Sequence, residues 1–215
     1  MKASFTMDFY PAKVYTTNMI ACILLSAGLS QRFGSPKALV DIGGEKAIER
    51  LQRMLIKTRI SEIVIVLGAH ANQIKPYILE HRKVRFVYNK NYNFGQTYSF
   101  KVGLQAIDPK VQAVLLLPVD YPFVCASTVS TLIEYFQDTE APILIPSFQE
   151  KKGHPPLISI DLRDEFLALS ANKGINSVLH AHESEVEGFP LNDPGVIRTF
   201  NTTEEFEAIK RSLSE

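Results

Sequence analysis

The feature that most constrains this fold is a repeated alternation of short apolar runs with stretches of helical spacing. The runs CILL, IVIV and AVLLLPV are continuously apolar, as a strand covered by helices on both faces requires. Four such pairs follow one another: 20–25 then 46–57, 63–67 then 71–81, 84–88 then 98–107, and 111–119 then 127–137. We therefore expect a three-layer α/β/α fold, in which helices cover both faces of a doubly wound, mostly parallel mixed sheet.

The sheet is expected to become mixed after Pro142. Residues 143–145 and 157–160 have the character of strands, and the polar stretch between them, SFQEKKGHPP, suits an exposed turn. Two short helices at 161–169 and 175–182 should precede a further strand at 196–200. A last amphipathic helix should begin near Thr202, where a hydroxyl and a following acid suit a helix start.

Length favours one domain. A chain of 215 residues is short for two domains, which usually need about 100–150 residues each. We expect a single domain over 19–215, preceded by an N-terminal tail at 1–18. The tail has no apolar core typical of a signal peptide, and the run at 19–25 is far below the about 20 residues of a membrane span.

Charge and cysteine content exclude several function classes. Lys plus Arg and Asp plus Glu both number 23, so no basic field favours nucleic acid, and no membrane partner is expected. Cys22 and Cys125 lack any metal-ligand spacing. We expect reduced thiols in a cytoplasmic protein.

The loop after the first strand is the first candidate site. Ligands of open α/β sheets bind outside the carboxyl ends of strands, where this loop lies. Gly28 and Gly34 allow close backbone approach to an anion, and Arg32 and Lys37 add positive charge. The loop has neither a Walker nor a GxGxxG pattern. It predicts phosphate binding, with a plain glycine turn carrying surface cations as the alternative.

Two further segments carry candidate ligands. An apolar strand ends on Asp120, which suits a magnesium ligand that faces the crevice, although Asp-Tyr-Pro is also a common turn sequence. Gly95, followed by Thr97 and Ser99 at a helix start, would offer free N–H groups and hydroxyls to a base or a phosphate. A plain capped helix is the alternative for that segment.

Taken together, these segments resemble a known family. LLSAGLSQRFGSPKALV is similar to the LxAGxSxRMGxxKxLL signature of the MobA-like nucleotidyltransferases, and its SAG start is more similar to the molybdenum cofactor cytidylyltransferase branch than to the guanylyl branch. Four further segments follow in the family's order, so the resemblance runs from about residue 20 to residue 206. It implies a Rossmann-like fold of the nucleotide-diphospho-sugar transferase type.

The resemblance also implies roles for individual residues. Arg32 and Lys37 would bind the triphosphate, Asp120 and Asn201 would hold Mg²⁺, and Arg32, Lys37 and Asp120 would be catalytic. His154, in the GHP segment, would bind the acceptor. The remaining nucleotide contacts would come from Leu25, Ser26, Ala27, Gly28, Ser30, Gly34, Gly68, Gly95, Thr97 and Ser99.

The chain departs from the family pattern at four positions. Gln96 and Tyr98 replace the methionine and serine of EGMxSSLRAGL. Thr199 and Asn201 stand where DDxGVLxDIDTPEDL has two aspartates. An asparagine still offers a carbonyl oxygen to Mg²⁺, but one negative charge is missing, so we expect weaker metal binding.

The implied reaction moves a nucleoside monophosphate from a nucleoside triphosphate, CTP by resemblance, to molybdopterin and releases pyrophosphate. A molybdoenzyme or a maturation protein would be a further partner. One alternative is a sugar-phosphate, choline-phosphate or methylerythritol-phosphate nucleotidyltransferase, because the loop says little about the acceptor. Another is a molybdenum cofactor carrier of the same fold with weak catalysis, which the altered Thr199 and Asn201 would suit.

Overall fold

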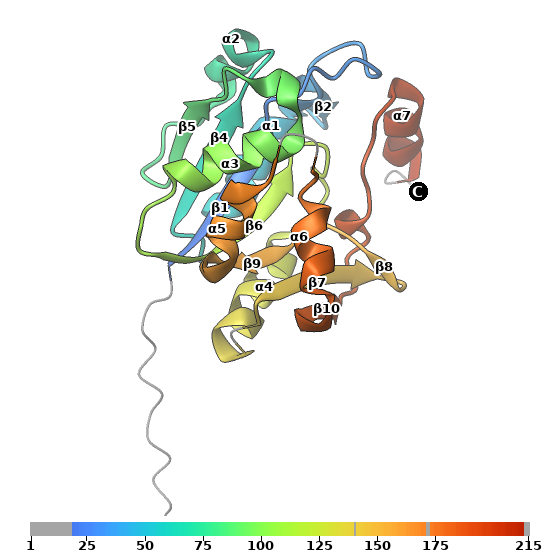
Figure 1. Ribbon diagram of the computed structural model, residues 1–215. Coiled ribbons are helices and arrows are strands. Elements are labelled where there is room, and N and C mark those ends of the chain that lie inside the picture. Colours follow the sequence, from blue (N-terminus) through green and yellow to red (C-terminus); the bar gives the residue numbers. More distant parts are fainter. Residues whose placement is uncertain (1–18, 140, 171–172, 213–215) are drawn as a thin grey trace, which may run out of the picture.

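A computed structural model describes residues 19–139, 141–170 and 173–212 (Figure 1). The tail predicted at 1–18 lies outside the described residues. One eight-stranded sheet has the order β10-β7-β9-β6-β1-β4-β5, with β8 paired to β7. Its strands are β1 (Met19–Ser26), β4 (Glu62–Leu67), β5 (Val84–Tyr88), β6 (Val111–Pro118), β7 (Ile143–Phe148), β8 (Lys151–Lys152), β9 (Leu157–Ser159) and β10 (Val186–Pro190).

The sheet is mixed and mostly parallel, as predicted. β1 pairs in parallel with both β4 and β6, β4 with β5, and β10 with β7. β9 runs antiparallel to β6 and β7, and β8 runs antiparallel to β7. The change of direction falls after Pro142, where the apolar pattern of the sequence loosens.

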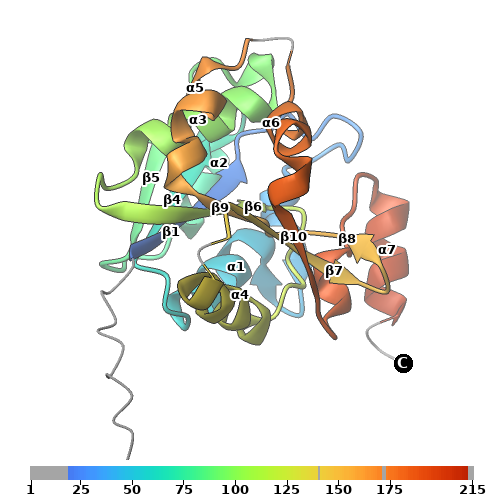
Figure 2. The same ribbon diagram turned by 60° about the horizontal axis from the view of Figure 1, so that its bottom comes forward.

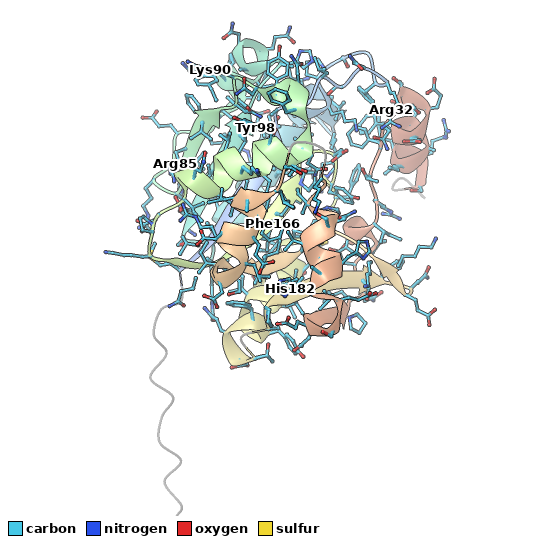
Figure 3. The ribbon with its side chains drawn as sticks, viewed as in Figure 1. Arg32, Arg85, Lys90, Tyr98, Phe166 and His182 are labelled. Atoms are coloured by element: carbon cyan, nitrogen blue, oxygen red, sulfur yellow. The ribbon has the colours of Figure 1, made fainter. Side chains whose placement is uncertain are left out.

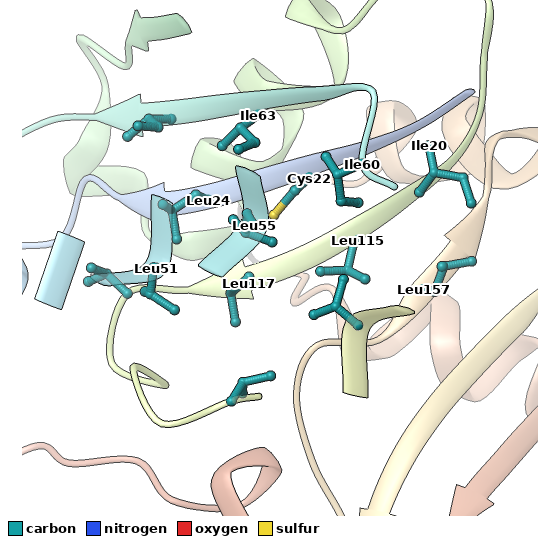
Figure 4. Close-up of a cluster of buried hydrophobic side chains, with 14 of the residues drawn as sticks. Ile20, Cys22, Leu24, Leu51, Leu55, Ile60, Ile63, Leu115, Leu117 and Leu157 are labelled. Atoms are coloured by element: carbon teal, nitrogen blue, oxygen red, sulfur yellow. The ribbon is translucent and has the colours of Figure 1, made fainter. Parts of the chain in front are cut away.

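Helices cover both faces of the sheet, which gives the predicted three layers. Figure 2 shows α1 (Ala47–Ile56) and α4 (Ala126–Thr139) on one face, and α3 (Gln96–Ala106), α5 (Arg163–Ala168) and α6 (Asn176–Ala181) on the other. Successive side chains of β1 enter two different cores. Ile20, Cys22 and Leu24 pack with Leu51 and Leu55 of α1 (Figure 4). The residues between them, Ala21, Ile23 and Leu25, pack towards α3.

The C-terminal helix α7 (Thr203–Ser212) lies apart from these layers (Figure 1). Phe206 on α7 packs against Phe200, with ring centroids 4.8 Å apart, and Phe33 lies 5.4 Å from Phe200. Phe33 belongs to the loop that follows β1. This aromatic cluster therefore holds the segment before α7 against the loop in which phosphate binding is predicted.

The prediction of a strand at 196–200 is wrong. The chain forms the 3₁₀ turn η6 (Pro194–Val196) there, and Val196 and Phe200 are fully buried without strand pairing. Pro194 has no N–H to donate to a sheet, and the Asp193 side chain accepts the Gly195 amide, which closes a turn. The sheet ends instead with β10, which the apolar pattern did not predict.

The helix predicted at 71–81 is much shorter, because α2 (Ala71–Ile74) passes into the 3₁₀ turn η2 (Lys75–Tyr77) around Pro76. The smaller elements are η1 (Lys37–Leu39), β2 (Asp41–Ile42), β3 (Glu45–Lys46), η3 (Tyr92–Phe94), η4 (Ile160–Leu162) and η5 (Glu183–Glu185). Within the described residues, we find no helix with the length and apolarity that crossing a bilayer requires.

One surface contact predicts a pH-dependent stability. His182 (Figure 3) lies 2.9 Å from Glu165 of α5 and 2.8 Å from Glu185, and these hydrogen bonds raise the pKa of His182 above its usual 6.5. The stabilisation is therefore complete below the unfolded pKa and is lost as pH rises through the folded pKa. We expect His182→Gln to lower the free energy of unfolding more at pH 6 than at pH 9, as measured by urea denaturation. An equal loss at both pH values would contradict this.

Candidate active site

The loop between β1 and η1, residues 27–36, contains a tight turn that is held by hydrogen bonds to Ser30. Ser30 has a φ of +51°, and its carbonyl oxygen accepts the amides of Phe33 and Gly34, both at 3.0 Å. Its hydroxyl accepts the Lys37 amide at 3.3 Å. Gly34 has a φ of +80°, a left-handed conformation that glycine adopts without steric cost. The turn returns the chain, and with it Lys37, to the end of β1.

A cavity of about 530 Å³ lies beside this loop, at the carboxyl ends of β1 and β6. This volume is typical of ligand pockets, and the position is the one expected in an open α/β sheet. Most of the predicted site residues line it, namely Leu25, Ser26, Ala27, Gly28, Ser30, Arg32, Lys37, Gly95, Ser99, Asp120 and Asn201. The hydroxyl oxygen of Ser26 is buried and has no hydrogen-bond partner in the described part of the chain.

Lys37 joins the two side chains predicted to bind metal. Its Nζ donates to Oδ2 of Asp120 at 2.9 Å and to Oδ1 of Asn201 at 3.0 Å. The same Asn201 oxygen accepts from the guanidinium of Arg32 at 3.2 Å; Figure 3 shows Arg32 beside α7. Three segments far apart in the sequence, the β1–η1 loop, the end of β6 and the segment before α7, therefore meet at one point.

These four side chains favour an anionic ligand. Arg32 and Lys37 carry two positive charges and Asp120 carries one negative charge, which leaves a formal charge of +1. Asn201 contributes oxygen without charge. Guanidinium and ammonium groups beside an open cavity are typical binding groups for phosphate.

The same cluster fits a divalent metal. Oδ2 of Asp120 and Oδ1 of Asn201 both contact one ammonium nitrogen, so both oxygens can also reach one cation. Over residues 19–139, 141–170 and 173–212, no group of three or more His, Cys, Asp or Glu side chains is gathered in a way that could hold a metal. Mg²⁺ commonly takes one or two protein oxygens and completes its shell with water and substrate phosphates. The donor set is therefore suitable for Mg²⁺.

Gly68 has a packing role in this geometry. It does not line the cavity, and a Cβ atom there would lie 2.4 Å from the carbonyl oxygen of Ala27 and 2.8 Å from Cβ of Tyr92. The Ala69 amide donates to the same Ala27 oxygen at 3.1 Å. Glycine at this position therefore lets the end of β4 approach the β1–η1 loop and fixes Ala27 beside the cavity.

The segment before α3 contributes backbone and one hydroxyl. Gly95, with a φ of +86°, precedes α3, whose first N–H groups have no partner within the helix. The Ser99 hydroxyl donates to the Gly95 carbonyl at 3.3 Å and accepts from the Asn89 amide group at 3.0 Å. Thr97 in the first turn of α3, like Gly34 in the loop, does not line the cavity.

His154 also lies outside the cavity, on the Tyr121 side of Asp120. Its ring packs on that of Tyr121 with centroids 4.4 Å apart. Burial lowers the pKa of His154 to about 4, and the charge of Asp120 opposes that shift only in part. The imidazole is therefore neutral near pH 7 and can exchange hydrogen bonds without carrying charge.

Several residues at the site were not predicted from the sequence. Tyr121 hydrogen-bonds Thr199, while burial, followed by the charge of Asp120, raises the pKa of Tyr121. Nε2 of His70 donates to the Leu29 carbonyl at 3.0 Å. His70 lines the cavity, and the other unpredicted lining residues include Gln31, Ile74, Tyr92, Asn93 and Gln96. Gln31 lies in the loop after β1, and the others lie after β4 or β5, so their positions follow from the strand-end rule. The sequence motifs assigned no role to their side chains.

The fold and the cavity together define a three-layer α/β protein with a candidate phosphate site at the carboxyl ends of its strands. The chain belongs to the MobA-like NTP transferase family, whose sequence model matches residues 22–186. The family resemblance predicted from the sequence motifs is thereby confirmed.

Two further proteins are similar in sequence to this chain. The chain is 27% identical over 140 residues to a probable UDP-N-acetylglucosamine pyrophosphorylase of Acanthamoeba polyphaga mimivirus, a match that covers 63% of this chain and 54% of that protein. It thus spans about half the length of that relative. It is 28% identical over 158 residues to nicotine blue oxidoreductase of Paenarthrobacter nicotinovorans, which covers 66% of this chain and 71% of that protein.

Solved structures share the fold. Rv0371c from Mycobacterium tuberculosis H37Rv superposes with a TM-score of 0.78 at 19% identity and covers 91% of this chain and 100% of that one. The same protein has been solved as a complex with manganese. Molybdopterin-guanine dinucleotide biosynthesis protein A from Archaeoglobus fulgidus gives a TM-score of 0.68 at 17% identity and covers 90% of this chain and 98% of that one. At these identities the likeness concerns the fold alone.

Proposed function

We propose that this nucleotidyltransferase moves a nucleoside monophosphate from a nucleoside triphosphate to a phosphorylated small molecule in a Mg²⁺-dependent reaction. The observation that carries the proposal is the contact of Lys37 with both Asp120 and Asn201 at the wall of the cavity. It gathers a cation for phosphate and two oxygens for metal beside the loop from the family signature. Family membership supports the reaction class.

In the proposed reaction, an oxygen of the acceptor phosphate attacks the α-phosphorus of the triphosphate. The bond between that phosphorus and the oxygen bridging to the β-phosphate breaks, and pyrophosphate leaves. A phosphate monoester is already ionised at neutral pH, so the step needs no general base. Catalysis then depends on positioning and on neutralising charge.

In this proposal, each residue at the cavity has a separate role. Arg32 and the backbone amides of residues 28–32 would hold the β- and γ-phosphates, because the Phe33 and Gly34 amides of the predicted 28–34 stretch already donate to the Ser30 carbonyl. Lys37 would hold the α-phosphate and its developing charge. Asp120 and Asn201 would hold Mg²⁺, which neutralises phosphate charge when bound. His154, which is neutral and lies beside Asp120 but outside the donor cavity, would bind the acceptor.

We propose CTP as the donor and molybdopterin as the acceptor, with a molybdoenzyme or maturation protein as recipient of the product in the cytoplasm. The SAG sequence at Ser26, Ala27 and Gly28 supports the choice of CTP by its resemblance to the cytidylyltransferase branch. The structural neighbour named for molybdopterin-guanine dinucleotide biosynthesis supports a pterin acceptor.

A carrier of molybdenum cofactor is the second candidate. It is favoured by Asn201, which leaves Asp120 as the one carboxylate in the four-residue cluster. A weaker metal site would reduce turnover and leave pterin binding intact. This candidate predicts binding without chemistry.

Pyrophosphate release tests these proposals. The protein would be incubated with Mg²⁺ and each of the four nucleoside triphosphates in turn, with and without molybdopterin. We expect pyrophosphate from CTP only when molybdopterin is present. Release with a sugar phosphate, choline phosphate or methylerythritol phosphate instead would reassign the acceptor. Tight pterin binding with no release from any mixture would favour the carrier.

A further inference from the structure

The Lys37 ammonium lies where a metal would have to bind in order to contact both Asp120 and Asn201. Its nitrogen is 2.9 Å from one oxygen and 3.0 Å from the other. The pair is largely shielded, since the side chain of Lys37 is 14% exposed and that of Asp120 is 22% exposed. Two cations held by the same oxygens at this depth repel each other strongly, because solvent screens them poorly. Lys37 and a divalent cation therefore compete for these oxygens.

The side-chain oxygen of Asn201 is also occupied by cationic donors. Its Oδ1 accepts from both Lys37 and Arg32, at 3.0 and 3.2 Å. A carbonyl oxygen has two lone pairs, so these two donors use its full capacity. While both cations stay in place, Asn201 has no lone pair left for a metal.

Lys37 can leave this position. Lysine carries its charge on a flexible four-carbon stem, and the cavity beside it is open to a ligand. A triphosphate in that cavity would offer Lys37 and Arg32 several negative charges, whereas the cluster offers one, on Asp120. Movement of both cations onto the phosphates would release the two oxygens together.

We propose that Lys37 is an internal counter-cation of the metal site, and that a triphosphate must draw it away before Asp120 and Asn201 bind a divalent cation. The nucleotide then binds first, through Arg32 and Lys37, without metal. This inference rests on the proposed function only in taking a nucleoside triphosphate as the ligand. It does not require that nucleotidyl transfer takes place.

This order gives a reason for an asparagine at position 201. A neutral oxygen holds Arg32 and Lys37 side by side without cancelling their charge, and the cluster keeps its formal +1 for the phosphates. An aspartate would make two carboxylates for two cations, a net charge of zero. In the free protein, Asn201 is thus a positioning residue for Arg32 and Lys37, and it becomes a metal ligand only after the triphosphate has bound.

Manganese binding without nucleotide tests the competition directly. Mn²⁺ would be titrated by electron paramagnetic resonance into the wild-type chain, Lys37→Met and the control Lys46→Met. Lys46 is also paired with an aspartate, Asp41 at 3.7 Å, but it lies on the β2–β3 hairpin and does not line the cavity. We expect Lys37→Met to bind Mn²⁺ about tenfold more tightly or better, and Lys46→Met to match the wild type. Equal affinity in all three proteins would overturn the proposal.

Nucleotide binding in EDTA tests the order in the unmutated chain, so the proposal does not depend on a folded variant. We expect calorimetry to detect CTP binding without metal, and Asn201→Asp to weaken it about tenfold. Binding that requires Mg²⁺ would overturn the proposal. Neither experiment needs turnover: a chain that gives both results but no pyrophosphate would refute the proposed transfer and keep this inference. Active transfer with no Lys37 effect on Mn²⁺ would do the opposite.

Discussion

Asp120→Ala should lower the rate of nucleotidyl transfer about a hundredfold or more, the scale of losing one preorganised electrostatic contact. The carboxylate is the single negatively charged group in the four-residue cluster, and it contacts Lys37 at 2.9 Å. Its loss would remove the charged one of the two oxygens that we propose bind metal, and it would leave Lys37 without its ion-pair partner. Initial rates of pyrophosphate release at saturating CTP and molybdopterin would measure the effect, with Mg²⁺ varied to show whether more metal restores the rate.

Asp41→Ala is the matched control. Asp41 also pairs with a lysine, Lys46 at 3.7 Å, but on an exposed hairpin that does not line the cavity. We expect its turnover to stay near that of the wild type, because both variants lose one carboxylate and one ion pair but only Asp120 faces the site. Near-normal turnover of Asp120→Ala would remove that residue from the reaction. Equal losses in both variants would point to a general charge effect.

The layers of this fold were predictable because burial on two faces leaves a clear pattern. In β1, alternate residues enter different cores, so every position must be apolar and the run reads as CILL. The strand-end rule then located the site, since a parallel sheet presents all its carboxyl ends at one edge. Asp120 and the loop at 27–36 follow from that rule without any contact information.

The meeting of Asn201 with Lys37 and Arg32 could not be predicted in the same way. These residues are 164 and 169 positions apart, and their contact depends on how Phe33, Phe200 and Phe206 pack. The family motif suggested a shared metal site, but only coordinates show that one asparagine oxygen accepts from both cations. That contact is the basis for the proposed order of binding.

The false strand at 196–200 and the missed strand β10 both arise because apolar residues in the sequence indicate burial and do not specify strand pairing. Val196 and Phe200 are apolar because they fill a core between loops, and such burial has the same sequence pattern as a strand. β10, in contrast, is an edge strand of half-buried and exposed residues that contains Gly188 and ends at Pro190, so its apolar signal is weak. Apolarity predicts burial, and it predicts a strand only where a partner strand is available.

Asp193→Ala should lower the free energy of unfolding by about 3 kcal/mol or more, because each buried donor left without its acceptor costs about 1–3 kcal/mol. Asp193 is 6% exposed. Its Oδ2 accepts the Cys125 amide at 2.9 Å and the Thr128 hydroxyl at 2.6 Å, and its Oδ1 accepts the Gly195 amide at 2.8 Å. Truncation would leave three donors without their acceptor. The midpoint of urea unfolding would measure the loss.

The loss should exceed that of an ordinary surface carboxylate because Asp193 joins two segments that the site requires. It ties the start of α4, just after Asp120, to the chain that leads to Asn201. Packing there is tight: a Cβ atom on Gly195 would lie 2.1 Å from the Phe123 carbonyl oxygen, so the segment cannot shift to find new partners. Asp161→Ala, which removes an exposed carboxylate bonded to Ser159, should cost less than about 0.5 kcal/mol. If both variants unfolded at the same urea concentration, the buried carboxylate would not be what holds these two segments together.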